Sequence, residues 1–112
     1  MKLPHASSAV VPAAKVRDYL LSLSHPVVRF KAAFFERLGY TAANWQQLAR
    51  DLCQHAIDNE AVGPASSDFG EKYEVHGNLT GPAAKTAAVV TVWIVLRGER
   101  TPRLVTAFPG RK

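Results

Sequence analysis

The sequence lacks most features that would indicate a membrane segment, a disulfide framework or a second domain. Its 112 residues include a single cysteine, which excludes an internal disulfide and a cysteine-rich zinc site. The longest apolar run, Ala87–Leu96, is well short of the roughly 18–20 residues of a membrane span. Residues 1–14 also lack the continuous apolar stretch of a secretory signal. We therefore expect one small, soluble, cytoplasmic domain over residues 1–112.

Several motifs of known chemistry are also missing. The sequence has no Walker loop, no Gly-x-Gly-x-x-Gly and no Gly-x-Ser-x-Gly. Cys53 falls inside a predicted helix, where a packed thiol is expected more often than a nucleophile. No two of the four histidines stand at metal-ligand spacing; they are His5, His25, His55 and His76. We expect neither a cofactor nor a metal, so any chemistry must use His, Lys, Arg, Tyr, Thr or Glu.

Acidic residues are outnumbered, with 9 Asp and Glu against 14 Lys and Arg and a net charge of +5. The excess is uneven along the chain. Residues 1–57 carry a net +4, residues 58–74 a net −4 and residues 75–112 a net +5. Two basic blocks that fold onto one face would attract phosphate. An ordinary solvated basic surface explains the same distribution, and both interpretations stay open here.

The first half of the chain has the apolar spacing of helices. Residues 1–11 are predicted to be an extended arm, and residues 13–58 the helical part. In the second helix the apolar residues cover more than half of the circumference, which indicates packing on two sides. Gly39 is a natural left-handed stop for that helix. The predicted helices are Ala13–Ser22, Pro26–Leu38 and Ala42–Asp58.

After a predicted loop at Asn59–Gly70 the apolar period changes to two, which is typical of strands. Residues 71–109 should form an antiparallel sheet of three to four strands. The fold class is therefore α+β, with about three N-terminal helices packed on a C-terminal β-meander. Helices arranged in this order are expected to cover one face of the sheet and leave the other open. The predicted strands are Tyr73–Leu79, Thr86–Arg97 and Pro102–Phe108.

The start of the second helix is the most unusual stretch of the sequence. His25 and Arg29 are four residues apart and share a helix face. Lys31 lies between apolar neighbours, so its amine must extend to solvent or serve a function. A capping histidine followed by two solvated cations is the structural alternative.

The predicted strands carry a second group of candidates. Glu74, His76 and Asn78 should share one face of the first strand, with Tyr73 on the other. An imidazole exchanges protons near neutral pH, which makes His76 a candidate general acid or base. Polar Thr91 and aromatic Trp93 interrupt the apolar central strand, and Thr106 could align beside them. This arrangement predicts a floor for a stacked base, or else plain cross-strand threonine pairing.

A ribonuclease that works without a metal needs few groups. One group takes the proton of the 2′-hydroxyl, a second protonates the leaving 5′-oxygen, and a cation stabilises the charge on phosphorus. The histidines His25 and His76 could supply the first two functions. The cations that could serve the third, or bind the RNA, are Lys31, Arg97 and Arg103.

Motifs over about residues 10–109 resemble a family of small bacterial toxin-like domains of uncharacterised function. The order of helices followed by a meander is also similar to the barnase–EndoU–colicin–RelE group of ribonuclease toxins. The motifs are Arg17-Asp-Tyr-Leu-Leu with Ser24-His25-Pro26, Lys31-Ala-x-Phe34-Phe35 to Leu38-Gly39-Tyr40, Lys72-Tyr73-Glu-Val with Gly77-x-Leu-Thr-Gly-Pro82, and Val90-Thr-Val-Trp93 with Leu104-Val-Thr-Ala-Phe-Pro109.

The resemblance implies a metal-independent endoribonuclease toxin that leaves a 2′,3′-cyclic phosphate and is neutralised by an acidic antitoxin or immunity protein. It implies catalytic positions at His25, Lys31, Thr91 and Thr106, to which the residues themselves add His76. The alternative is a non-catalytic module that binds a protein or RNA on the open sheet face. An antitoxin or immunity protein is disfavoured by the positive charge. The residues expected to contact RNA are Arg29, Tyr73, Trp93, Arg97 and Arg103.

Overall fold

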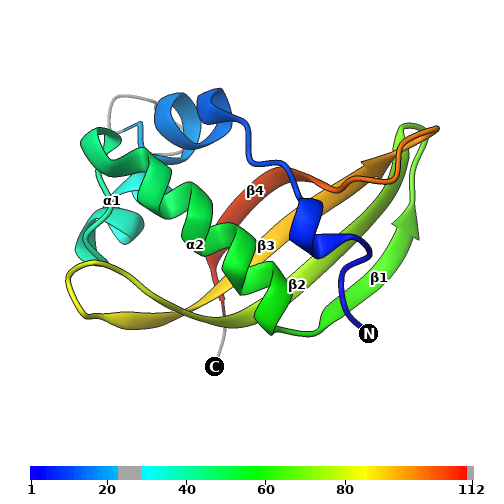
Figure 1. The fold of residues 1–112 in the computed structure, drawn as a ribbon. Coiled ribbons are helices and arrows are strands. Elements are labelled where there is room, and N and C mark those ends of the chain that lie inside the picture. The colour runs from blue at the N-terminus through cyan, green and yellow to red at the C-terminus, as the bar shows by residue number, and fades with distance from the viewer. Residues whose placement is uncertain (23–28, 111–112) are drawn as a thin grey trace.

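The fold combines a bundle of short helices with one four-stranded sheet (Figure 1). It is seen in a computed structural model that describes residues 1–22 and 29–110. The helical elements are η1 (Ala6–Ser8), η2 (Ala14–Leu20), α1 (Arg29–Arg37), η3 (Ala42–Asn44) and α2 (Trp45–Asp58). The strands are β1 (Ala61–Ser66), β2 (Gly70–Thr80), β3 (Thr86–Leu96) and β4 (Arg103–Pro109).

The sheet is an antiparallel meander with the strand order β1-β2-β3-β4. The helices of the domain precede its strands in the sequence, which confirms the predicted α+β class. Along β2 the odd-numbered residues from Tyr73 to Leu79 are largely covered, while Glu74, His76 and Asn78 are exposed. The alternation predicted from the sequence is therefore present, and it fixes which side chains can meet on each face.

The predicted loop at Asn59–Gly70 is wrong, because this segment contains strand β1. Five of the six residues of β1 are exposed, so the strand has no apolar alternation to reveal it. It also contains the Gly63–Pro64 pair, at a break in its pairing with β2 between Val62 and Ala65. Edge pairing with β2 holds this segment in the sheet, and such tertiary pairing overrides its weak local preference for a strand.

Helix α2 packs on one face of the sheet and supplies much of the core. Its buried residues are Leu48, Leu52, His55 and Ala56, which lie at helical spacing along one side. The helix follows a turn that Thr41 and Asn44 close as a reciprocal capping box. Before that turn, Gly39 has a φ of +104° and lies against the backbone of Ala83, so a side chain there would be strained and would collide.

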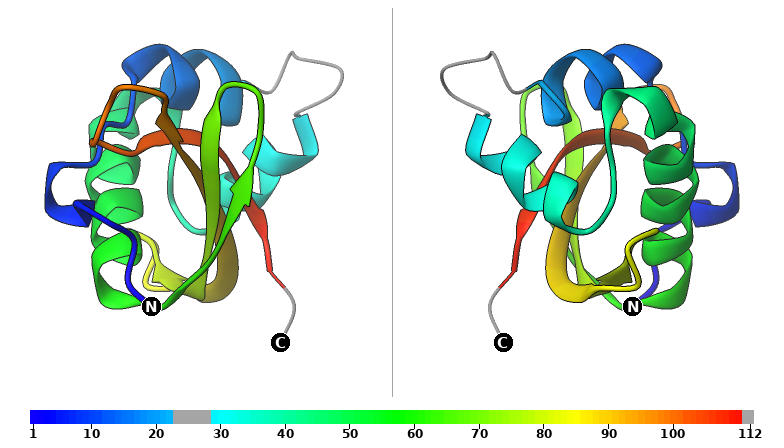
Figure 2. Two further views of the ribbon diagram at one scale, coloured as in Figure 1. Left: turned by 90° about the vertical axis from the view of Figure 1, so that its right-hand side faces the viewer. Right: turned by 90° about the vertical axis from the view of Figure 1, so that its left-hand side faces the viewer.

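Helix α1 lies on the other side of the sheet from α2, beside β4 (Figure 2). The expectation that one face of the sheet would be entirely open is therefore wrong at the β4 side. The reason is that α1 makes contacts in two directions. Phe35 is fully buried in the core, while Lys31 reaches β4. The face that β2 presents on this side, with Glu74 and His76, stays exposed.

A bulge in β4 determines which face Thr106 occupies. Leu104 pairs with Trp93 and Thr106 pairs with Val92, so the single residue Val105 stands between two successive pairs. Without that extra residue, Leu104 and Thr106 would share a face. The bulge instead turns Thr106 to the face opposite Thr91 and Trp93. The expected alignment of Thr106 beside those two residues is therefore wrong.

Candidate functional site

The amine of Lys31 meets the hydroxyl of Thr106 on the α1 side of the sheet. Lys31 Nζ donates a hydrogen bond of 3.0 Å to Thr106 Oγ1, across 75 residues of sequence. Both side chains are half-buried. Helix α1 brings the lysine to this point, and the β4 bulge turns the threonine toward it. Two residues that the sequence singled out independently thus come into contact.

Aromatic rings, not carboxylates, surround this lysine. Lys31 Nζ lies 5.7 Å from the centroid of the Tyr19 ring and 5.9 Å from that of Phe108. Within residues 1–22 and 29–110, no Asp or Glu forms an ion pair with Lys31. Ring faces attract an ammonium group without neutralising its charge. Lys31 therefore keeps its positive charge available for an anion that approaches this face.

His76 lies on the same face, two strands from Thr106. His76 pairs with Val90 and Val90 pairs with Phe108, so the three residues form one row across β2, β3 and β4. Neighbouring strands are about 4.8 Å apart, so the imidazole and the amine flank a strip about two strands wide. His76 Nε2 is 3.0 Å from Glu74 Oε1, and both side chains are exposed. The carboxylate orients the imidazole at the open end of the row.

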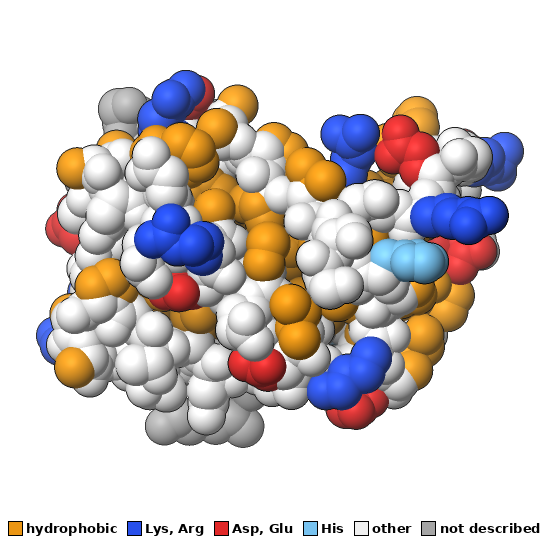
Figure 3. Space-filling view, in the orientation of Figure 1, with side chains coloured by type: hydrophobic (Ala, Val, Ile, Leu, Met, Phe, Trp, Pro, Cys, Tyr) orange, Lys and Arg blue, Asp and Glu red, His pale blue; other side chains and the backbone are white. Residues whose placement is uncertain are grey.

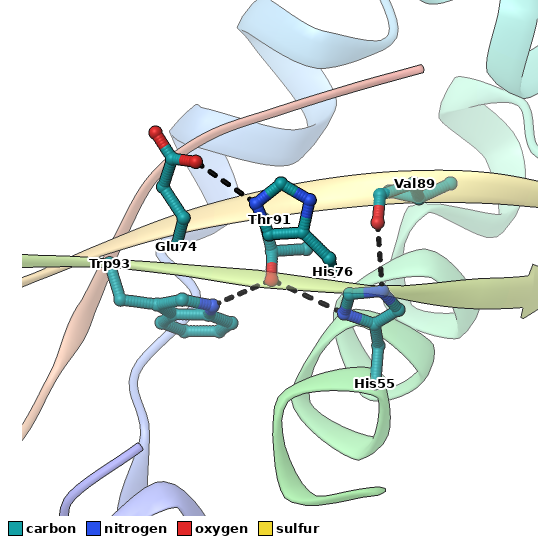
Figure 4. Close-up of polar contacts among 6 residues, drawn as sticks. All are labelled: His55, Glu74, His76, Val89, Thr91 and Trp93. Carbon is teal, nitrogen blue, oxygen red and sulfur yellow. Dashed lines mark hydrogen bonds and ion pairs between the residues drawn. The ribbon is translucent and has the colours of Figure 1, made fainter. Parts of the chain in front are cut away.

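Thr91 belongs to a separate, fully buried network on the α2 side. Trp93 Nε1 donates to Thr91 Oγ1 at 2.8 Å, and Thr91 Oγ1 lies 3.2 Å from His55 Nδ1. Figure 4 shows these side chains meeting on the far side of the strands from Glu74 and His76. Thr91 and Trp93 have no exposed surface. The structure therefore does not bring them to Lys31, and Trp93 presents no ring face to a ligand.

The hydrogen bonds of His55 determine its tautomer. Its Nε2 lies 3.1 Å from both the carbonyl of Gly77 and that of Val89, so this nitrogen carries the proton and donates. Nδ1 then accepts from the Thr91 hydroxyl, which in turn accepts from Trp93. Every polar atom of the network has a partner while His55 is neutral. Burial lowers the pKa of His55, and the two carbonyl hydrogen bonds oppose that shift.

This lowered pKa predicts an acid-sensitive fold. The unfolded chain takes up the His55 proton near pH 6.5, whereas the folded chain resists it, so stability is full above that pH and falls below it. One such group contributes a slope of at most about 1.4 kcal/mol per pH unit. The measurement is the free energy of unfolding in urea between about pH 7.5 and about pH 5, for the wild type and for His55→Gln.

The His55→Gln protein should lose the part of the pH slope that belongs to this residue. Asn78→Gln serves as the control, because Asn78 is exposed and carries no titratable group, so the slope should stay unchanged. Equal slopes in the wild type and the His55→Gln protein would contradict the assignment. Sequence patterns predict no role for His55, because no other histidine stands at metal-ligand spacing from it. Its position three residues after buried Leu52 was the available signal that it faces the core.

The remaining predicted residues are spread over the molecule. His25 lies outside the described residues, as does the side chain of Arg29. Tyr73 is buried on the α2 side with 7% of its surface exposed. Arg97 and Arg103 are exposed near the β3–β4 turn, and Arg103 Nε is 3.2 Å from Glu99 Oε1. Basic and acidic side chains alternate at this end of the molecule (Figure 3).

Other kinds of site find little support in the described part of the chain. It contains no cluster of three or more His, Cys, Asp or Glu side chains placed to hold a metal. None of its helices has the length and apolarity to cross a membrane. Cys53 is half-buried, and burial raises the pKa of its thiol, which lowers its reactivity. The row from His76 to Lys31 is therefore the candidate site.

Comparison with known proteins identifies a family and a related fold. No curated protein matches the chain. A solved structure titled "Contact-dependent growth inhibition toxin - immunity protein complex from Klebsiella pneumoniae 342" contains a chain that is 21% identical. The match has a TM-score of 0.71 and covers 96% of this chain and 97% of that chain, which shows a shared fold. The profile of one family matches residues 2–111, so the chain belongs to the family described as Domain of unknown function (DUF6883).

Proposed function

We propose that this chain is the toxin domain of a bacterial polymorphic toxin system and that it cleaves RNA without a metal. The contact between Lys31 and Thr106, on the face that carries His76, is the observation that carries the proposal. The chain of shared fold comes from a structure whose title names a growth inhibition toxin and its immunity protein, which supports the toxin assignment. The net charge of +5 supports an anionic substrate.

In the proposed reaction, the phosphodiester binds between the two ends of the row, with His76 at one end and Lys31 at the other. His76 takes the proton of the 2′-hydroxyl, the 2′-oxygen forms a bond to phosphorus, and the bond from phosphorus to the 5′-oxygen breaks. Lys31 stabilises the additional negative charge on the phosphate oxygens, and Thr106 holds the amine in place. A second acid protonates the leaving 5′-oxygen. His25 stays the predicted candidate for that function, and it lies outside the described residues.

The proposal also covers where the domain acts and what restrains it. RNA of a bacterial target is in the cytoplasm, so the domain would act there. The partner would be an immunity protein with an acidic surface, because the chain is basic overall. A non-catalytic RNA-binding module remains the second candidate. It would use the same exposed face of β2 and leave the RNA intact.

Incubation with RNA tests the reaction directly. Purified protein is added to total RNA with and without a chelator, and the new ends are analysed. We expect chelator-resistant cleavage that leaves 2′,3′-cyclic phosphate. Lys31→Met should lose about 10²–10³ in rate, because one transition-state cation is removed. Lys85→Met is the matched control, since Lys85 is exposed in the β2–β3 turn.

Three results would argue against the proposal. Intact RNA that remains bound to the protein would favour the non-catalytic module. Cleavage that the chelator abolishes would show that the metal-independent scheme is wrong. In cells, induced wild-type protein should arrest bacterial growth, and Lys31→Met should relieve the arrest at equal protein levels. Normal growth on strong induction of wild type would contradict the toxin assignment.

A further inference from the structure

Two lysines differ from all other described cations in their burial. Lys15 and Lys31 are half-buried, whereas every other Lys and Arg side chain that the structure describes is exposed. Lys15 comes from η2 and Lys31 from α1, so two separate helices hold them. Folding removes part of the water around each ammonium group, which costs free energy unless another group compensates. Their partial burial distinguishes these two lysines from the exposed cations of the remaining described surface.

Both lysines meet at one aromatic ring. Lys15 Nζ lies 5.2 Å and Lys31 Nζ 5.7 Å from the centroid of the Tyr19 ring. No carboxylate in residues 1–22 and 29–110 forms an ion pair with either amine. The ring attracts both cations without neutralising either of them. Two ammonium groups around one ring, neither of them paired with a carboxylate, can each bind an anion.

We propose that Lys15 is a second phosphate-binding residue, and that Lys15 and Lys31 bind neighbouring phosphates of one single-stranded RNA around Tyr19. This inference rests on the proposed function. Lys31 would hold the phosphate that reacts, since it contacts Thr106 on the face that carries His76. Lys15, which contacts neither residue, would hold a phosphate that does not react. Phosphates recur along every strand, so a pair of cations matches a strand better than a single phosphate ion.

Binding of an RNA that cannot be cleaved tests the site apart from catalysis. The probe is a fluorescein-labelled decamer of 2′-O-methyl RNA, whose blocked 2′-oxygen cannot attack phosphorus. We expect Lys15→Gln to raise the Kd about tenfold, as for loss of a hydrogen bond to a charged group. The slope of log Kd against log salt concentration should fall by about 0.7, the value for one phosphate contact on a single strand.

Three variants control this measurement. Lys85→Gln loses the same charge from an exposed position and should change the Kd and the slope much less. Lys15→Arg keeps the cation and should restore most of the affinity. Lys15→Met keeps the apolar stem against Tyr19, so it reports on the lost charge if Lys15→Gln folds poorly. Circular dichroism of each protein verifies the fold.

The outcomes separate this inference from the proposed function. Lys15→Gln should raise the KM for cleavage and leave kcat nearly unchanged, unlike Lys31→Met, which should lower kcat. If the folded Lys15→Gln protein binds the decamer as tightly as the Lys85→Gln protein does, Lys15 is not a phosphate-binding residue, whether or not the RNA is cleaved. The same conclusion follows if Lys15→Gln weakens the binding of an immunity protein but not that of the decamer. The converse result is that the wild-type protein cleaves no RNA while Lys15→Gln still weakens decamer binding and Lys15→Arg restores it. That result would support the binding site and contradict the proposed ribonuclease activity.

Discussion

His76→Ala is expected to slow RNA cleavage by about 10²–10⁴-fold, the contribution of a positioned general acid or base. The imidazole occupies the open end of the row that runs across β3 to Phe108, where an RNA strand can approach from solvent. Because its side chain is exposed, its removal should leave the free energy of unfolding nearly unchanged. The measurement is the single-turnover rate on a short RNA, with the urea midpoint measured in parallel.

Two neighbours of His76 provide controls. Asn78→Ala changes the next residue on the same face of β2 and should retain the wild-type rate. Glu74→Gln keeps a hydrogen-bond acceptor near the imidazole but removes the charge, so it should have a smaller effect than the loss of the ring. A His76→Ala protein as fast as wild type would remove this residue from the mechanism. Lys31 and His25 would then be the groups to test.

Thr91→Val is expected to destabilise the fold severely and to leave the chemistry intact. Valine matches threonine in shape but cannot accept the hydrogen bond from Trp93 Nε1 or donate one to His55 Nδ1. Two buried polar groups lose their partner at once, and each costs about 1–3 kcal/mol when it is left unsatisfied. The measurement is the free energy of unfolding at neutral pH, where His55 is neutral. Thr91→Ser keeps the hydroxyl and should recover a large part of the loss.

Thr106→Val should give the opposite pattern. Thr106 is half-buried, and its hydroxyl contacts Lys31, so its loss should reduce the cleavage rate with little change in stability. The two valine substitutions make the same chemical change on opposite faces of the sheet. A Thr91→Val protein that is stable but inactive would contradict the division between core and site. It would instead assign Thr91 to catalysis, as the family resemblance implies.

The fold class follows from sequence patterns that are strong over long segments. Alternation along β2 and β3 predicts both strands and places His76 and Tyr73 on opposite faces. Apolar residues over more than half of the circumference of the second helix predict a helix that packs on two sides. These features are local, because each depends on the spacing of residues within a single element.

The register of the sheet could not be predicted in this way. Strand β1 is exposed along most of its length, so its pairing with β2 leaves no apolar pattern. The bulge at Val105 depends on how β4 lies against β3, a relation between elements that no residue type in β4 reveals. Sequence analysis therefore placed Thr106 beside Thr91. A single extra residue separates the two threonines and gives Lys31 its partner.

The sequence predicts the individual residues of the candidate site, but it does not predict which of them lie together. Lys31 and His76 are predicted from their chemistry and Thr106 from its place on a strand, and the family resemblance implies both Lys31 and Thr106. Their shared face depends on α1 crossing to the far side of the sheet. Lys15 was missed, because its spacing in η2 is that of an ordinary amphipathic segment. The convergence of two lysines on Tyr19 requires the three-dimensional arrangement of η2 and α1.

The separation of 75 positions between Lys31 and Thr106 also determines when the candidate site forms on a newly made chain. Strand β4 is the last element of the sheet, so the lysine lacks its threonine until nearly the whole domain has left the ribosome. Under the proposed function, unfinished chains would therefore lack a competent site in the cell that makes them. An immunity protein of the kind proposed would be needed only once β4 has joined the sheet.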